Sequence, residues 1–194
     1  MSGNLVTMWP TTIYQHDLAD IHQFNTALQD QILDREATDA SKSFGVVGGR
    51  KSSPDLLTWQ TADTQRLTEH IIDACTTMLG LTDNEPLPPM SAHAWAVVYR
   101  PGGSHELHGH HDAAFSGVYY VAASSDPAGG GAIEIYDPRM ALHARHPHRP
   151  PQALRIQPRP GLLIAFPAWA LHRVLPVTST ELRICIAFNV AFKK

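Results

Sequence analysis

Histidines gather in one short stretch of this chain. Four of its 12 histidines lie within seven positions, at His105, His108, His110 and His111, and Asp112 follows them directly. Neutral imidazole offers a nitrogen lone pair at physiological pH, which makes histidine the commonest protein ligand for transition metals. The sequence therefore predicts a metal site in this stretch.

The pattern His110-x-Asp112, followed 60 positions later by His172, is the sharpest feature of the stretch. Two histidines and one carboxylate can bind Fe(II) on one face and leave the other positions open for further ligands. His-x-Asp suits this role because residues i and i+2 of an extended segment point to the same side. We therefore predict His110, Asp112 and His172 as metal ligands and catalytic centre, with His172 arriving from a facing strand.

Arg183 lies inside an apolar stretch, residues 182–189, with Cys185 two positions further on. A lone guanidinium in such a strand is costly unless it is paired. Its planar fork matches a carboxylate bidentately, so the distal carboxylate of a dicarboxylic co-substrate would be a suitable partner. An ordinary ion pair with Glu134 or Glu181 is the structural alternative.

The rest of the chain predicts helices first and short strands afterwards. Helical spacing covers about 18–32, with Asp17 placed as a cap, and about 61–79, with Gly80 closing the helix. Residues 45–55 are rich in glycine and serine and are predicted to form a loop. Strands are predicted at 94–100, 115–123, 131–137, 153–157, 162–166 and 182–192. Many short strands separated by turns indicate an antiparallel sandwich or barrel.

Length and composition fit one globular domain spanning residues 1–194. The chain is 43% hydrophobic and carries a formal charge of -3, which gives no electrostatic reason to expect nucleic acid or a membrane surface as a partner. With two cysteines and no visible secretory signal, the sequence predicts a cytoplasmic protein. A homodimer is the commonest form that a soluble oligomer takes.

Several motifs resemble known oxygenases. Tyr99-Arg-Pro, His110-His-Asp112, His172 and Arg183 look like the prolyl/lysyl hydroxylase branch of the 2-oxoglutarate (2OG)/Fe(II)-dependent dioxygenases. A closer resemblance is to a group of small 2OG-Fe(II) oxygenases. It is carried by Ser116-Gly-Val-Tyr-Tyr120, Asp137-Pro-Arg139, Phe166-Pro-Ala-Trp-Ala-Leu-His172 and Arg183-Ile-Cys-Ile-Ala-Phe-Asn189. With Trp9-Pro10 and Gly48-Gly49, the resemblance covers nearly the whole chain.

The resemblance implies a mainly β fold: a double-stranded β-helix (jelly-roll) core at about 93–192, with two N-terminal supporting helices within about 15–80. It also implies that Tyr99 and Tyr120 line the co-substrate pocket beside Arg183 and Cys185. Relatives in the small group often carry His-x-His where this chain has His108 and His110, and many lack an acid at Asp112. Two ligand sets therefore stay open, His110/Asp112/His172 and His108/His110/His172, of which the first is favoured because a carboxylate offsets the metal charge.

The function expected from the resemblance is a 2OG-dependent dioxygenase, a hydroxylase, that uses Fe(II), 2OG and O2, with ascorbate as a candidate reductant. Its substrate would be a small molecule or an amino-acid side chain with an unactivated C–H bond. Asp137, Arg139 and Trp169 are candidates for contacts on the substrate side. The alternative is a metal-binding, cupin-like jelly roll without 2OG-dependent oxidation, because a fold alone does not determine function.

Overall fold

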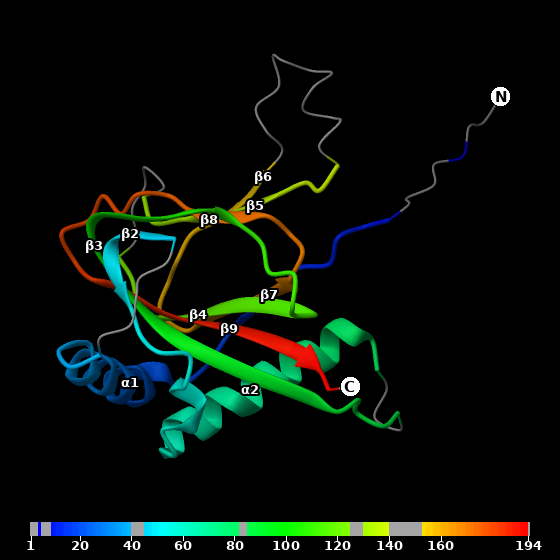
Figure 1. Ribbon diagram of the computed structural model, residues 1–194, viewed down its shortest axis with the longest axis horizontal. Helices are drawn as coiled ribbons and strands as arrows, with labels where there is room; N and C mark the ends of the chain where they lie inside the picture. Colours follow the sequence, from blue (N-terminus) through cyan, green and yellow to red (C-terminus); the bar gives the residue numbers. More distant parts are fainter. Residues whose placement is uncertain are drawn as a thin grey trace, which may run out of the picture.

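A computed structural model describes residues 4, 9–39, 45–81, 85–124, 130–139 and 153–193. Two layers of strands face each other, and two helices lie beneath the lower layer (Figure 1). Residues 143–151, for which the sequence predicts an exposed, irregular loop, lie outside the described residues. None of the described helices is long and apolar enough to cross a membrane.

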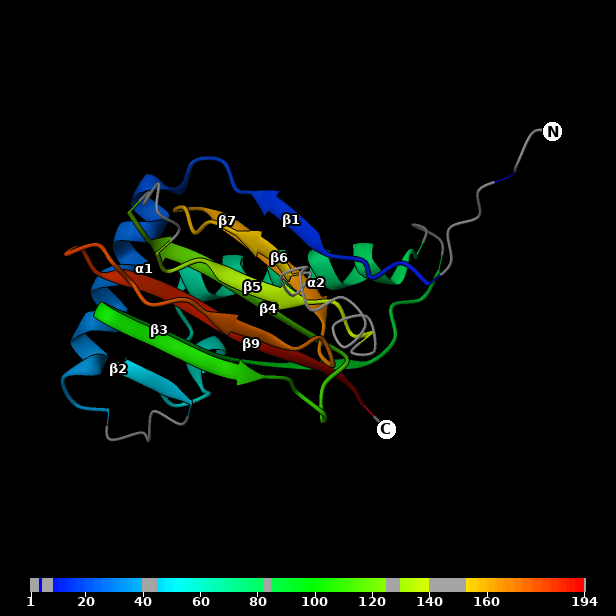
Figure 2. The ribbon, with the colours of Figure 1, turned by 90° about the horizontal axis from the view of Figure 1, so that it is seen from above.

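The strands form one curled antiparallel sheet, with β2 pairing β3 beside the main path β1-β7-β4-β9-β3-β8-β5-β6. The strands are β1 (Tyr14–Asp17), β2 (Val46–Lys51), β3 (Met90–His108), β4 (Phe115–Ala122), β5 (Ile133–Tyr136), β6 (Ala153–Ile156), β7 (Leu162–Pro167), β8 (His172–Val174) and β9 (Arg183–Phe192). Seen from above, the helices lie behind this sheet (Figure 2). The mainly β, jelly-roll prediction is confirmed.

Strand β3 joins the two layers. Its first half pairs with β9 from Met90 to Tyr99, and its end pairs with β8 from His105 to His108. The segment Pro101-Gly102-Gly103, whose proline and glycines predict a turn, is instead a bend inside this one long strand. Gly103 is required there, because a Cβ would lie 2.8 Å from the carbonyl oxygen of Arg100 and 2.9 Å from that of Gly48.

The helices cover the outer face of the lower layer. α1 spans Ile21–Glu36 and α2 spans Ala62–Leu79, which Thr61 caps at its start and Gly80 closes in a left-handed conformation. The predicted cap of the first helix was wrong. Asp20 occupies that position without a side-chain cap, while the carboxylate of Asp17 accepts two hydrogen bonds from Arg159.

A short 3-10 turn, Leu56–Thr58, precedes α2. The loop predicted at 45–55 was also wrong in part, because Val46–Lys51 forms β2. Its glycines favour a loop locally, but pairing along β3 supplies the backbone hydrogen bonds that hold the strand.

Alternation along the strands divides the buried side chains into two cores. Ala94, Ala96 and Val98 of β3 face the helices, whereas Trp95, Val97 and Tyr99 face the inside of the curl.

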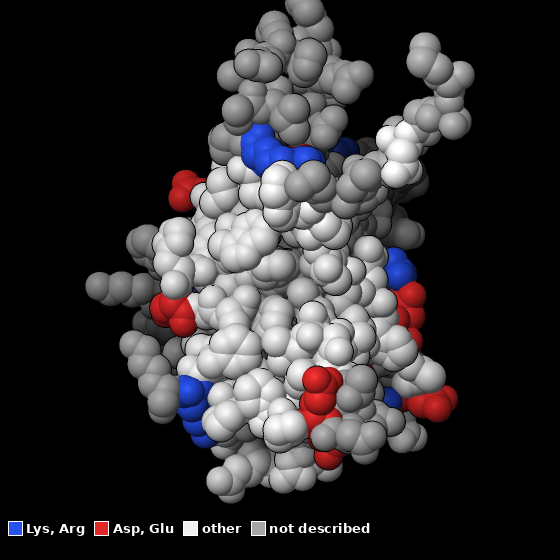
Figure 3. All heavy atoms as spheres, turned by 90° about the vertical axis from the view of Figure 1, so that its right-hand side faces the viewer, with Lys and Arg blue, Asp and Glu red and all other residues white. Residues whose placement is uncertain are grey.

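Acidic and basic side chains on the face shown in Figure 3 are scattered around its edge and leave the middle uncharged. The polar residues of interest lie inside the curl, within the second core.

Candidate metal and co-substrate site

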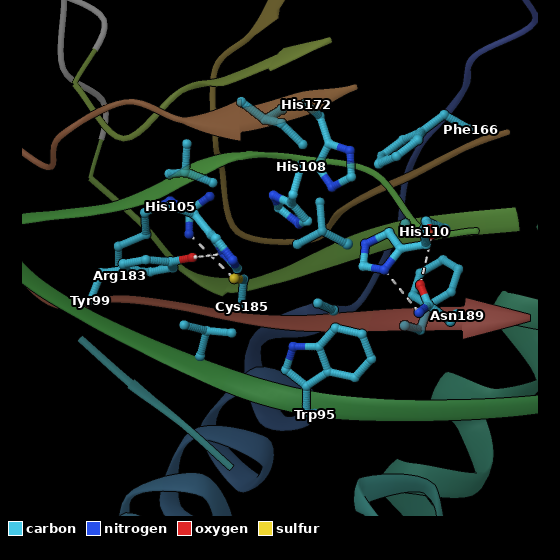
Figure 4. A pocket seen from close by; sticks show the side chains of 18 residues that line it. Trp95, Tyr99, His105, His108, His110, Phe166, His172, Arg183, Cys185 and Asn189 are labelled. Carbon is cyan, nitrogen blue, oxygen red and sulfur yellow. Dashed lines mark hydrogen bonds between the residues drawn. The ribbon is translucent and has the colours of Figure 1, made fainter. Parts of the chain in front are cut away.

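Three imidazoles converge inside the curl: His108 at the end of β3, His110 in the turn after it, and His172 at the start of β8. Their ligand nitrogens all lie within 4.8 Å of one another. His108 and His172 are direct cross-strand partners, so the β3–β8 register places their side chains on the same face. The backbone N–H of His110 donates to the carbonyl of Ala168 at 2.9 Å, which ties the turn to the opposite segment. Figure 4 shows the three rings turned toward a common space.

Backbone carbonyls orient two of these rings. Nδ1 of His108 lies 2.7 Å from the carbonyl oxygen of Glu106, and Nδ1 of His172 lies 2.9 Å from that of Ala170. A carbonyl can only accept, so Nδ1 must carry the proton in each ring. Each Nε2 therefore keeps its lone pair, which is the form that binds a metal.

Burial keeps the three rings neutral. Burial, together with the neighbouring His108, lowers the pKa of His172 to about 3 and that of His110 to about 4. The pKa of His108 is lowered by burial as well. The cluster therefore offers three uncharged nitrogen donors, a set that suits a divalent transition metal.

Asp112 lies outside this cluster and is exposed. The prediction assumed that His110 and Asp112 continue an extended strand, but β3 ends at His108 and the following residues turn. Alternation of side chains therefore no longer applies to the pair. The negative charge of Asp112 still raises the pKa of His110, and this effect opposes the larger lowering of that pKa by burial. Of the two ligand sets, the structure brings together His108, His110 and His172.

Arg183 is 3% exposed and lies beside the same space. Its Nε donates to the carbonyl of Gly131 at 3.0 Å and its Nη1 to Sγ of Cys185 at 3.3 Å. The guanidinium lies over the rings of Tyr99 and Tyr120, at 4.8 and 5.0 Å from their centroids. Arg183, Cys185, Tyr99 and Tyr120 are therefore close together.

Neither of the two alternative partners, Glu134 and Glu181, forms an ion pair with Arg183. The carboxylate of Glu134 binds Arg155 at 2.6 Å and Arg173 at 2.8 Å. Within the described ranges, no carboxylate forms an ion pair with Arg183. A buried guanidinium of this kind is costly without a counter-charge, so the arrangement favours an anionic ligand.

Two buried polar atoms in the described part of the chain also have no hydrogen-bond partner: Oη of Tyr120 and Nε1 of Trp95. Tyr120 lies next to Arg183, and Trp95 lines the pocket that holds the three imidazoles. Buried polar groups are normally satisfied, so both atoms indicate a ligand that brings acceptor oxygens. A 2OG molecule bound to a metal has this chemistry, and the residues present therefore fit it.

The comparisons with known proteins agree with this chemistry. Residues 93–189 match the family described as "Putative 2OG-Fe(II) oxygenase". The chain belongs to this family. A plain metal-binding cupin is accordingly not favoured, and the cofactors of the oxygenase are Fe(II), 2OG and O2.

Solved structures share the fold of the oxygenase. A Pseudomonas putida prolyl-4-hydroxylase is 16% identical, with a TM-score of 0.66 over 95% of this chain and 94% of that one. HygX from Streptomyces hygroscopicus with nickel and 2OG bound is 12% identical, with a TM-score of 0.65 over 94% and 84%. A viral collagen prolyl hydroxylase from Paramecium Bursaria Chlorella virus-1 is 14% identical, with a TM-score of 0.61 over 94% and 96%. A search of curated proteins found no match.

The three predicted substrate-side residues lie together, outside the histidine pocket of the oxygenase. Asp137 and Arg139 form an ion pair at 2.6 Å, and with the half-exposed Trp169 they line an outer groove. Trp169 belongs to the turn that leads into His172, three positions before it in the sequence.

Sequence reasoning missed three residues of the pocket. His105 stacks on His108 with ring centroids 4.3 Å apart, and its Nδ1 lies 3.2 Å from the hydroxyl of Tyr99. Asn189 lies next to His110, and Ser116 donates a hydrogen bond to Asn189. Both stand within motifs that carry the family resemblance, but nothing in the local sequence assigns them a contact with a histidine.

Proposed function

We propose that this oxygenase hydroxylates an unactivated C–H bond of a small molecule or of an amino-acid side chain, with His108, His110 and His172 as iron ligands. One observation carries the proposal. Three neutral imidazoles converge within 4.8 Å beside a buried arginine for which no described carboxylate is a partner. A metal and a dicarboxylate would satisfy both halves of this arrangement.

The iron, when bound, supplies the activation of O2 that is coupled to oxidation of 2OG. The histidines bind the metal and add no charge to it. With three neutral ligands, the carboxylates of 2OG are the negative charges that offset Fe(II). 2OG is therefore expected to strengthen metal binding in this pocket.

Arg183 would hold the distal carboxylate of 2OG. Its contacts with Gly131 and Cys185 fix the direction of the side chain before any ligand arrives, which lowers the entropy lost on binding. The hydroxyl of Tyr120 would donate to the same carboxylate, because it is buried and has no other described partner.

Apolar side chains form the rest of the pocket wall and would exclude water from the reacting groups. The wall includes Val97, Val118, Ile133, Phe166 and Val174. The substrate would enter from the groove lined by Asp137, Arg139 and Trp169. Solved structures with this fold include prolyl hydroxylases and HygX with hygromycin B bound, so both peptidyl and small-molecule substrates are worth testing.

The test is the release of succinate from 2OG in the presence of Fe(II), ascorbate and air, with panels of free amino acids and proline-containing peptides. Succinate release that depends on Fe(II), and that at least one substrate stimulates, is expected. Failure to bind 2OG in the presence of metal would contradict the proposal.

Arg183→Ala is expected to weaken 2OG binding by about 100-fold, because it removes a bidentate, charge-assisted contact. Mn(II) binding should stay close to that of the wild type. The matched control is Arg155→Ala, which removes a half-exposed arginine from β6. Equal loss of Mn(II) and 2OG binding in the Arg183 variant would show that this residue has only a structural role.

A cytoplasmic location and a homodimer are further parts of the proposal. Cell fractionation and light scattering of the purified protein would test them.

A further inference from the structure

His110 is the least firmly held of the three clustered histidines. His108 and His172 stand on paired strands and each donates Nδ1–H to a backbone carbonyl. His110 follows the end of β3, in a turn, and none of the described residues places a carbonyl at its Nδ1. Something else must fix its ring if it is to act as a ligand.

A side chain from β9 takes the place of that carbonyl. Nδ2 of Asn189 lies 3.2 Å from Nδ1 of His110, and the hydroxyl of Ser116 donates to Oδ1 of Asn189 at 2.7 Å. Ser116 and Asn189 are cross-strand partners on β4 and β9, and both are buried. Figure 4 shows the resulting line from Asn189 to the His110 ring.

The orientation of this amide decides which nitrogen of His110 can bind a metal. If Nδ2 donates to Nδ1, then Nε2 carries the proton and cannot be a ligand. A half-turn of the amide places Oδ1 against Nδ1, where it accepts a proton as the carbonyls of Glu106 and Ala170 do in the other two rings. Nδ2 then donates to Oγ of Ser116, so no hydrogen bond is lost.

We propose that Asn189 is a positioning residue for the metal, which holds His110 in the Nε2-binding form through this half-turn, with Ser116 locking the amide. The proposal rests on the proposed function, because it assumes that the three histidines bind the metal. Outer-shell partners of metal-bound histidines fix the tautomer and the ring direction, and their loss typically costs 10–100-fold in metal affinity.

The position of Asn189 along β9 agrees with this role. Arg183, Cys185, Ala187 and Asn189 are alternate residues and all line the pocket. One strand therefore presents the arginine for the co-substrate near one end and the amide for a metal ligand near the other.

The test is a titration of the metal-free protein with Mn(II), followed by the electron paramagnetic resonance signal of the free ion, with Co(II) absorption as a second readout. Asn189→Leu is expected to bind Mn(II) 10–100-fold more weakly than the wild type. Asn189→Asp should restore most of the affinity, because its carboxylate accepts Nδ1–H. Ser116→Ala should lose less Mn(II) affinity than Asn189→Leu, because it releases the Asn189 amide without removing it.

Asn25→Leu is the matched control. Asn25 is a buried asparagine with two hydrogen bonds, to the carbonyl of Val121 and from the hydroxyl of Tyr119, in the core beside the helices. The Asn25→Leu substitution should lower the stability of the protein without changing its Mn(II) affinity or its Co(II) spectrum.

Unchanged Mn(II) affinity in Asn189→Leu, or an Asp variant no better than the Leu variant, would overturn the proposal while the proposed function stands. If Asn189→Leu does not fold, the Mn(II) affinities of Asn189→Asp and Ser116→Ala test the proposal instead. Absence of Mn(II) binding in the wild type would instead overturn the proposed function, and this proposal with it.

Discussion

At the scale of single residues, the site combines groups that a packed interior normally avoids. His172, Arg183 and Asn189 are each no more than 6% exposed, yet all three are polar. His172 and Asn189 have hydrogen-bond partners, and Arg183 has two acceptors but no described counter-charge. A pocket of this kind is stable without ligand only because the surrounding fold holds it, and it gains most when an anion enters.

The two ligand sets make opposite predictions for substitution. His108→Ala is expected to lower Mn(II) affinity by at least about 100-fold, because one of three donors is removed. Asp112→Ala should retain affinity within a few-fold, since this side chain is exposed and outside the cluster. Calorimetric titration of both variants measures the difference. Loss of binding in Asp112→Ala with retention in His108→Ala would restore the set His110/Asp112/His172.

The sequence could predict His110, His172 and Arg183 because their residue types and spacing carry the signal. It could not decide between His108 and Asp112, because each stands two positions from His110 and alternation serves both equally. The choice depends on where β3 ends, and that is set by its pairing with the short, distant β8. Asn189 was out of reach for the same reason, since its contacts with Ser116 and His110 bridge more than seventy positions.

At the scale of elements, the bend in β3 builds the site. Before the bend the strand pairs with β9, which carries Arg183, and after it the strand pairs with β8, which carries His172.

The helices and most of the strands were predictable from periodicity. Strands β1, β2 and β8 were not, because β2 is rich in glycine and β1 and β8 have only four and three residues, so tertiary pairing rather than local preference forms them.

Gly103→Ala is expected to lower the free energy of unfolding by about 1–3 kcal/mol, because the new Cβ would press on two backbone carbonyls at the bend. Mn(II) affinity should fall as well, since the bend places His108 opposite His172. Chemical denaturation and Mn(II) titration measure the two effects. The control is Ser104→Ala, a substitution at the next residue that adds no atom. It should leave stability and Mn(II) affinity nearly unchanged. Wild-type stability in Gly103→Ala would mean that the bend relaxes freely.

At the scale of the whole molecule, the two cores have different tasks. The core between the sheet and the helices is filled by apolar side chains such as Phe24, Leu67 and Ile71. The core inside the curl has apolar side chains around a polar centre. The first can therefore hold the fold while the second keeps space for ligands.

Ligands should consequently stabilise the entire fold rather than a single loop. Mn(II) at about a hundred times its dissociation constant is expected to add about 2.7 kcal/mol, which corresponds to a rise in Tm of about 5–10 °C, and 2OG at the same ratio should add a similar amount again. Removal of the metal with EDTA should reverse it. Thermal unfolding followed by circular dichroism measures the shift, and Arg183→Ala should show a smaller shift from 2OG than the wild type.

The placement of β9 has a consequence for biogenesis. It is the last of the described strands in the chain, yet it lies between β3 and β4 in the sheet. Until it inserts, neither the arginine nor the amide faces the histidines, so a nascent chain that lacks it has no competent centre. A slip of one residue in its register would turn both groups away together.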